Sequence, residues 1–183
     1  MDPPLSALDL EHPPPGGGTS STALSNGNLR VVVDAATGYV TATRVSDGAV
    51  LLRQTALAFG PPTVPGTRAG SASALVTFGG TAGERIYGLG EHRTGRVQQL
   101  PFRQLFVHTL EYDVSSGADS TIPWYASSLG YGFVWNSPGF GFADLSESAL
   151  SWYANATLNA DFWITTTEAG SGVFRWAASE ACE

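Results

Sequence analysis

Leu-Arg-Val-Val-Val-Asp-Ala-Ala-Thr-Gly-Tyr-Val-Thr-Ala-Thr-Arg-Val, residues 29–45, is the stretch that decides the fold. Residues 29–33 are rich in β-branched side chains, and Asp34 ends the run. The turn 35–38 then leads into 39–45, where apolar and polar side chains alternate as in a half-exposed strand. The stretch therefore predicts a β-hairpin.

The same pattern of short apolar or alternating runs between Gly, Pro, Asp and Asn continues along the chain. Ser46-Asp47-Gly48 is a second turn with the Asp-Gly pair typical of hairpins, so a meander is the simplest layout. The predicted strands are 29–33, 39–45, 50–59, 72–78, 104–110, 121–127, 131–135, 140–145 and 158–167. No run of a dozen residues shows clean helical periodicity, which leaves no crossover helices for a parallel sheet. We expect an all-β, antiparallel β-sandwich.

Length and composition fit one globular domain with a tail. The chain has 183 residues, of which 43% are hydrophobic and only 14% charged. Residues 1–26, with three successive prolines and three successive glycines, predict a disordered tail, and the sandwich is expected over 27–168. The net charge of -7 and the lack of a Lys/Arg-rich run argue against a nucleic-acid partner.

The sequence assigns no compartment. Its single cysteine, Cys182, allows no internal disulfide, and no apolar run suits a membrane span or a signal peptide. Asn155-Ala156-Thr157 fits the N-glycosylation pattern, which makes Asn155 a candidate for that modification in the secretory pathway. No spacing of His, Cys, Asp or Glu predicts a metal site, and we expect no cofactor.

Three stretches carry a resemblance to a known family. Residues 84–91 read Glu-Arg-Ile-Tyr-Gly-Leu-Gly-Glu, which on residue chemistry alone is a glycine-bracketed turn. Residues 122–138 read Ile-Pro-Trp-Tyr-Ala-Ser-Ser-Leu-Gly-Tyr-Gly-Phe-Val-Trp-Asn-Ser-Pro. Residues 158–167 read Leu-Asn-Ala-Asp-Phe-Trp-Ile-Thr-Thr-Thr. In this order they resemble segments of the amino-terminal domain of family 31 glycoside hydrolases, which include α-glucosidases and α-xylosidases.

The resemblance covers roughly residues 27–168 and implies a galactose-mutarotase-like sandwich packed against a (β/α)8 barrel. Residues 169–183 would then be a linker toward that barrel. The matching positions are expected to be structural. They are Tyr87, Gly88, Leu89, Gly90, Glu91, Pro123, Gly130, Tyr131, Gly132, Asn136 and Asp161.

The catalytic carboxylates of the family belong to the barrel, and no matching motif occurs in this chain. A retaining glycosidase needs two carboxylates about 5 Å apart across the scissile bond. We therefore expect no catalytic residue here and no activity from this chain alone. The resemblance implies an α-glycoside or oligosaccharide as the substrate of a longer enzyme, and the barrel as the missing partner domain.

Candidate sugar contacts are few. The polar loop 111–120 corresponds to a family loop that lines the substrate pocket, so Asp113 and Glu111 are the candidate substrate contacts. The aromatic residues of 124–142 offer flat surfaces for sugar rings, yet in a sandwich most of them should pack inward. Neither the adjacent Glu91-His92-Arg93 nor the distant pair His92 and His108 forms a spacing that favours catalysis or metal binding.

Three functions remain open. The first is an accessory domain of a family 31 glycoside hydrolase, which predicts an exposed apolar face where the barrel would pack. The second is an autonomous, lectin-like carbohydrate-binding module. The third is a relative of aldose-1-epimerase, which would use His and Glu as acid and base, although the chain is short for that fold.

Overall fold

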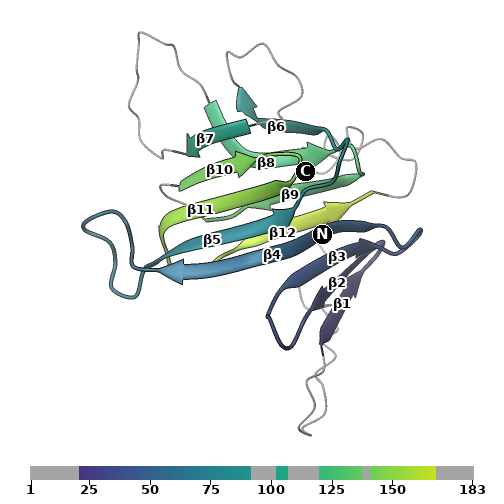
Figure 1. Ribbon diagram of the computed structural model, residues 1–183, viewed down its shortest axis with the longest axis horizontal. Coiled ribbons are helices and arrows are strands. Elements are labelled where there is room, and N and C mark those ends of the chain that lie inside the picture. Colours follow the sequence, from purple (N-terminus) through teal and green to yellow (C-terminus); the bar gives the residue numbers. More distant parts are fainter. Residues whose placement is uncertain (1–20, 92–101, 107–119, 138–140, 168–183) are drawn as a thin grey trace, which may run out of the picture.

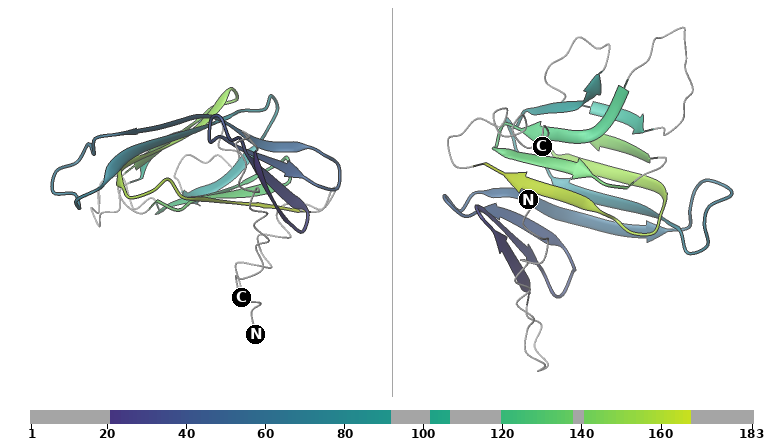
Figure 2. Two further views of the ribbon diagram at one scale, coloured as in Figure 1. Left: turned by 90° about the horizontal axis from the view of Figure 1, so that it is seen from below. Right: turned by 180° about the vertical axis from the view of Figure 1, so that it is seen from behind.

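The computed structural model describes residues 21–91, 102–106, 120–137 and 141–167, and these form a two-layered β-sandwich of antiparallel strands (Figure 1). No helix occurs in these ranges. The two sheets lie face to face when the molecule is turned (Figure 2). The predicted fold class is therefore confirmed.

The larger sheet has eight strands in the order β1-β2-β3-β4-β5-β11-β10-β7. Its first five strands follow one another, so the predicted meander is confirmed there. The bounds are β1 Thr22–Asn26, β2 Leu29–Val33, β3 Val40–Arg44, β4 Val50–Gly60, β5 Ala72–Gly79, β7 Phe102–Phe106, β10 Gly141–Leu145 and β11 Ala149–Thr157.

The smaller sheet has four strands in the order β12-β9-β8-β6. Its bounds are β6 Ile86–Glu91, β8 Ser120–Ser127, β9 Tyr131–Trp135 and β12 Phe162–Thr166. Because β6 and β12 are its edges, each of them pairs with only one strand within the described part of the chain. Each of the three stretches singled out in the sequence contributes to this sheet.

Buried and less buried side chains alternate along the strands, and the buried ones form the core. In β5 the buried apolar side chains are Ala74, Val76 and Phe78, and in β11 their register partners Ala154, Trp152 and Leu150 are also buried. The small sheet adds aromatic rings from the other side, and these stack on Trp152: the ring centroid of Phe133 lies 5.1 Å from it and that of Tyr125 lies 6.1 Å from it. Burial of such rings is the largest favourable contribution to a core of this kind.

Several strands differ from the sequence expectation, among them the strand predicted over 104–110, which the structure describes as β7 Phe102–Phe106. β1 begins at Thr22, inside the stretch 1–26 predicted as tail, because a two-residue loop with Gly27 at φ 54 pairs Asn26 with Leu29. β11 was not predicted as a strand. The stretch 158–167, predicted as a single strand, contains the shorter β12. Residues 1–20 and 168–183, which include most of the predicted tail and linker, lie outside the described residues.

Candidate functional surface

The three family-like stretches lie together in the small sheet. β6 carries the first stretch and pairs with β8, which begins the second, while β9 continues the second and pairs with β12 from the third. Segments up to about 80 residues apart in the sequence thus lie in one sheet. The small sheet is therefore the part of the molecule where a family-specific role should be sought.

The first stretch is an irregular strand and not the simple turn expected from its glycines. Gly88, Leu89 and Gly90 have φ values of 117, 66 and 98, a run of left-handed backbone that is unfavourable for leucine. Between the pairs Gly88↔Tyr125 and Gly90↔Thr121, Leu89 alone faces the three residues 122–124 of β8. Pro123, which has no N–H to give to a ladder, lies in that interruption.

The indole ring of Trp124 packs directly on Gly88. A Cβ at this position would lie 2.9 Å from the carbonyl oxygen of Trp124 and 3.0 and 3.1 Å from ring atoms Cε3 and Cζ3. The ring therefore lies against the backbone of β6, where any side chain would displace it. The glycine is required both by its φ and by this contact.

A buried carboxylate links the segment before β6 to strands β8 and β9. Glu84 is only 4% exposed, and its Oε1 accepts hydrogen bonds from Ser127 Oγ at 2.5 Å and from Tyr131 Oη at 2.6 Å. The hydroxyl of Tyr125 lies 3.3 Å from that of Tyr131. Burial raises the pKa of both tyrosines well above the ordinary value, so their hydroxyls keep their protons and remain donors.

The other motif residues also make contacts within the sandwich. The side chain of Asn136 donates to Oδ2 of Asp161 at 2.6 Å, and its backbone N–H donates to the carbonyl of Asp161 at 3.0 Å. Gly130, with φ 81, accepts from the backbone N–H of Thr167 at 3.2 Å. Gly132 lies in β9, and the backbones of Tyr87 and Glu91 pair with β8.

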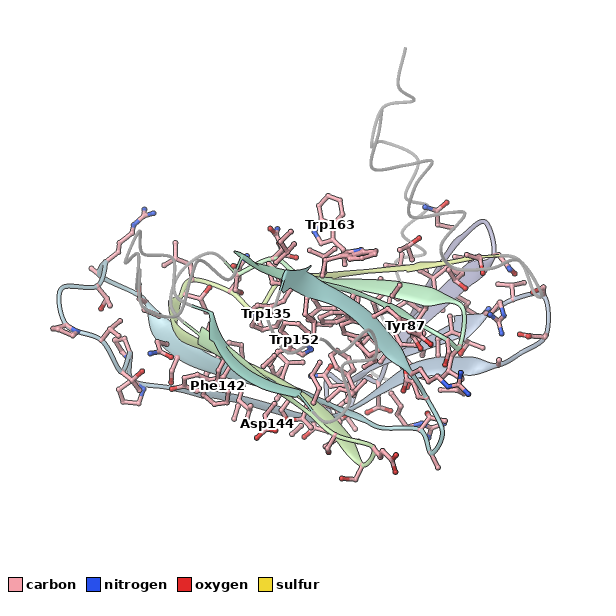
Figure 3. All side chains as sticks on the ribbon, turned by 90° about the horizontal axis from the view of Figure 1, so that it is seen from above. Tyr87, Trp135, Phe142, Asp144, Trp152 and Trp163 are labelled. Carbon is pink, nitrogen blue, oxygen red and sulfur yellow. The ribbon has the colours of Figure 1, made fainter. Side chains whose placement is uncertain are left out.

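The aromatic block packs mainly inward, as expected. Its buried members are Tyr125, Tyr131, Phe133 and Trp135. Trp135 and Trp152 lie between the sheets in Figure 3, whereas Phe142 and Asp144 lie on the outer side of the large sheet. On the opposite outer side Trp163 points away from the sandwich, and 65% of it is exposed (Figure 3).

Several candidate residues lie outside the described residues. These are Asp113 and Glu111, which follow β7 in the chain, and His92 and His108. Asn155 lies in β11, half-buried, and its backbone carbonyl accepts from Thr63 at 3.0 Å. The predictions for substrate contact and glycosylation thus stay predictions.

The described residues lack both a metal-binding cluster and a membrane-spanning helix. They hold no group of three or more His, Cys, Asp or Glu arranged to bind a metal ion. Within the same ranges there is no helix of the length and apolarity that crossing a bilayer requires.

Comparison with known proteins gives one curated relative and many similar structures, while no family model matches. The relative is an uncharacterized family 31 glucosidase of Pseudescherichia vulneris, 33% identical over 90 residues. Those residues are 49% of this chain and 16% of the relative, so the chain spans about a sixth of that protein's length.

The similar structures have the same fold and are also much longer. A GH31 α-xylosidase from a soil metagenome, solved with xylose, gives a TM-score of 0.73 at 21% identity, covering 96% of this chain and 27% of that one. A xylosidase from Aspergillus niger gives 0.66 at 24% identity, covering 82% and 21%. A GH31 dextranase of Flavobacterium johnsoniae, solved with glucose, gives 0.65 at 15% identity, covering 93% and 20%. The resemblance predicted from the three stretches is thereby confirmed.

Proposed function

We propose that this chain, similar to the amino-terminal domain of family 31 glycoside hydrolases, serves as that domain in a longer enzyme that cleaves an α-glycosidic bond. The observation that carries the proposal is the gathering of all three family-like stretches into one sheet. The likeness to solved structures supports it, because the first of them covers 96% of this chain but only 27% of the other. The domain would support hydrolysis without supplying the reacting carboxylates.

Four carboxylates of the described residues make contacts within the sandwich. Glu84 is buried and bonded to two hydroxyls, and Asp161 is held by Asn136. Asp34 and Asp47 accept backbone N–H groups within tight turns. Cleavage with retention needs two carboxylates about 5 Å apart and open to substrate. Glu84 and Asp161 are each held by side chains of the sandwich, which favours a structural role for these two over a reaction with substrate.

The test compares the purified 183-residue chain with the longer enzyme, using p-nitrophenyl α-glucoside and α-xyloside. We expect hydrolysis by the longer enzyme and none by the chain alone. Turnover by the chain above that of a mock purification would contradict the accessory role, and absence of turnover by the longer enzyme would contradict the family activity.

Asp113 and Glu111, which the sequence predicts to lie in a loop, provide a finer test of the same proposal. If the loop contacts sugar, Asp113→Asn in the longer enzyme should raise KM several-fold, because a carboxylate accepts hydrogen bonds from sugar hydroxyls. Ser115→Ala in the same loop is the matched control. An unchanged KM for both variants would remove the loop from the substrate site.

An autonomous carbohydrate-binding module is the second candidate, and the exposed ring of Trp163 favours it. Flat apolar surfaces fit the C–H faces of pyranose rings. Calorimetric titration with maltose and with xylo-oligosaccharides separates the two functions. Saturable heat that Trp163→Ala abolishes would favour the module, and no heat at millimolar sugar would exclude it.

A further inference from the structure

The turn between β1 and β2 contains an asparagine followed by a glycine. Asn26 is the exposed last residue of β1, and Gly27 begins the two-residue loop that pairs Asn26 with Leu29. The whole sequence holds one Asn-Gly pair, and it lies here. The side-chain amide of an asparagine can be attacked by the backbone nitrogen of the next residue, and a glycine has no side chain to shield that nitrogen.

Both reacting groups are accessible. Among the described residues, nothing hydrogen-bonds to the side-chain amide of Asn26 or to the backbone N–H of Gly27. Gly27 has φ 54, and nothing lies within 4 Å of the position that a Cβ would take. β1 is also the edge strand of the large sheet (Figure 1). The turn can therefore open locally without disrupting the sheet beyond β2.

The other asparagines lack this combination. Asn28 and Asn136 are held by hydrogen bonds of their side chains, and they precede leucine and serine. Asn155 and Asn159 precede alanine, whose methyl group shields the backbone nitrogen. Asn159 is the best comparison with Asn26, because it is exposed and its side-chain amide likewise has no hydrogen-bond partner among the described residues.

We propose that Asn26 is a site of spontaneous deamidation. The backbone nitrogen of Gly27 forms a bond to Cγ of Asn26, and the side-chain nitrogen leaves as ammonia with the proton of the Gly27 N–H. Water then opens the resulting five-membered succinimide ring at one of its two C–N bonds. Opening at Cγ gives aspartate, and opening at the main-chain carbonyl gives isoaspartate. Either product adds a negative charge at the turn, and the inference does not depend on the proposed function.

Isoaspartate also lengthens the main chain of the turn by one methylene group, and the contacts of Asn28 determine where this length goes. The backbone carbonyl of Asn28 accepts from the N–H of Val45 at 2.7 Å, and its Oδ1 accepts from the N–H of Ser46 at 2.8 Å. Its Nδ2 donates to the carbonyl of Thr167 at 2.9 Å. The β2 side of the turn is thus fixed, so the extra length displaces β1 and loosens this edge strand.

Peptide mapping by mass spectrometry tests the site in the 183-residue chain, aged in native buffer at mildly alkaline pH. We expect the deamidated fraction at Asn26 to exceed that at Asn159 several-fold. Gly27→Ala should lower it to the level of Asn159. Gly48→Ala is the matched control, since Gly48 also has a positive φ, at 72, with nothing within 4 Å of an added Cβ, and it should leave Asn26 unaffected.

Equal fractions at Asn26 and Asn159 in the native chain would overturn the proposal. The same sample aged in urea shows the reason. Preferential deamidation of Asn26 in urea alone would mean that the folded turn protects it, whereas equal fractions in urea would mean that Gly27 does not promote the reaction at all.

Hydrogen exchange of the separated isoaspartate form tests the loosening of β1. The amides of β1 should exchange faster than in the unmodified chain, while those of the central strand β5 keep their rates. Asn26→Asp is the control, because it adds the charge without the methylene group and should leave β1 unchanged. Unchanged exchange in the isoaspartate form would overturn the loosening, and equally fast exchange in Asn26→Asp would overturn chain lengthening as its cause.

Discussion

Replacement of Tyr131 by phenylalanine removes one of two hydroxyl donors from a buried carboxylate. In the native protein Oε1 of Glu84 accepts from Tyr131 at 2.6 Å and from Ser127 at 2.5 Å. A hydrogen bond to a charged group contributes about 1.5–3 kcal/mol when its partner is left buried. The contact with Tyr125 at 3.3 Å is long and adds little. We expect Tyr131→Phe to lower the free energy of unfolding by about 2 kcal/mol.

Urea unfolding followed by tryptophan fluorescence measures this change. With a slope of about 2 kcal/mol/M for a domain of this size, the midpoint should fall by about 1 M. Tyr153→Phe is the control, because the half-buried Tyr153 stacks on Phe142, which lies on the outer side of the large sheet (Figure 3), and its midpoint should change little. Equal midpoints for Tyr131→Phe and the native chain would refute the reasoning.

A double and a triple variant separate the loss of a hydrogen bond from the cost of leaving the Glu84 carboxylate buried without a donor. Adding Ser127→Ala to Tyr131→Phe should cost more than the sum of the single changes, because Oε1 of Glu84 then loses both hydroxyl donors. Adding Glu84→Met to that double variant should restore most of the stability, since apolar packing can replace a buried polar group. Additive costs without recovery would show that the carboxylate is satisfied in another way.

The remaining predictions concern the small sheet and one turn. Gly88→Ala should destabilise the chain by about 1–3 kcal/mol in urea unfolding and Gly83→Ala by less, because of these two glycines only Gly88 combines a positive φ with a crowded site. Trp163→Ser should reduce binding of a hydrophobic dye while changing the unfolding free energy by less than about 0.5 kcal/mol, because the side chain is mostly exposed; an unchanged dye signal would contradict an open apolar face. Hydrogen bonds from Thr37 lower the pKa of Asp34, so its contribution is present above the ordinary value of 3.8 and is lost as the pH falls below it. Asp34→Asn should therefore lower the melting temperature at neutral pH and have little effect at about pH 2, and an equal loss at both pH values would contradict the role of the charge.

Strands whose side chains form a clear apolar or alternating run could be predicted from the sequence. Residues 131–135 were predicted to their ends, and the hairpin of β2 and β3 needed only the β-branched run and the turn between its strands. β11 was overlooked because Trp152 and Tyr153 are adjacent aromatics that hide the alternation of Leu150, Ser151 and Trp152. The loop pair Gly27-Asn28 carried the hairpin signal for β1, but its position beside a Pro/Gly/Ser-rich stretch favoured a tail.

The irregular strand β6 could not be predicted by local reasoning. Two glycines in six residues favour a turn, and strand formation there depends on contacts with β8, about 30 residues later in the chain. Its backbone is tolerated because Leu89 is buried and Pro123 needs no ladder bond at the interruption. Likewise, nothing local predicts that Glu84 is buried, since both of its hydroxyl partners come from distant strands. The resemblance marked these positions as family-like without giving their physical reason.

The chemistry of the small sheet favours a protein partner over a sugar for its outer face. A sugar site combines an aromatic surface with polar groups that bind the hydroxyls. Around Trp163 the register neighbour is Val134, and β8, β9 and β12 offer no charged side chain that could accept or donate strongly. A catalytic domain supplies its own apolar surface and needs no such groups at the centre of the contact. The same lack of charge that makes this face a poor sugar site therefore makes it a suitable interface, and the substrate contacts predicted at Asp113 and Glu111 stay predictions.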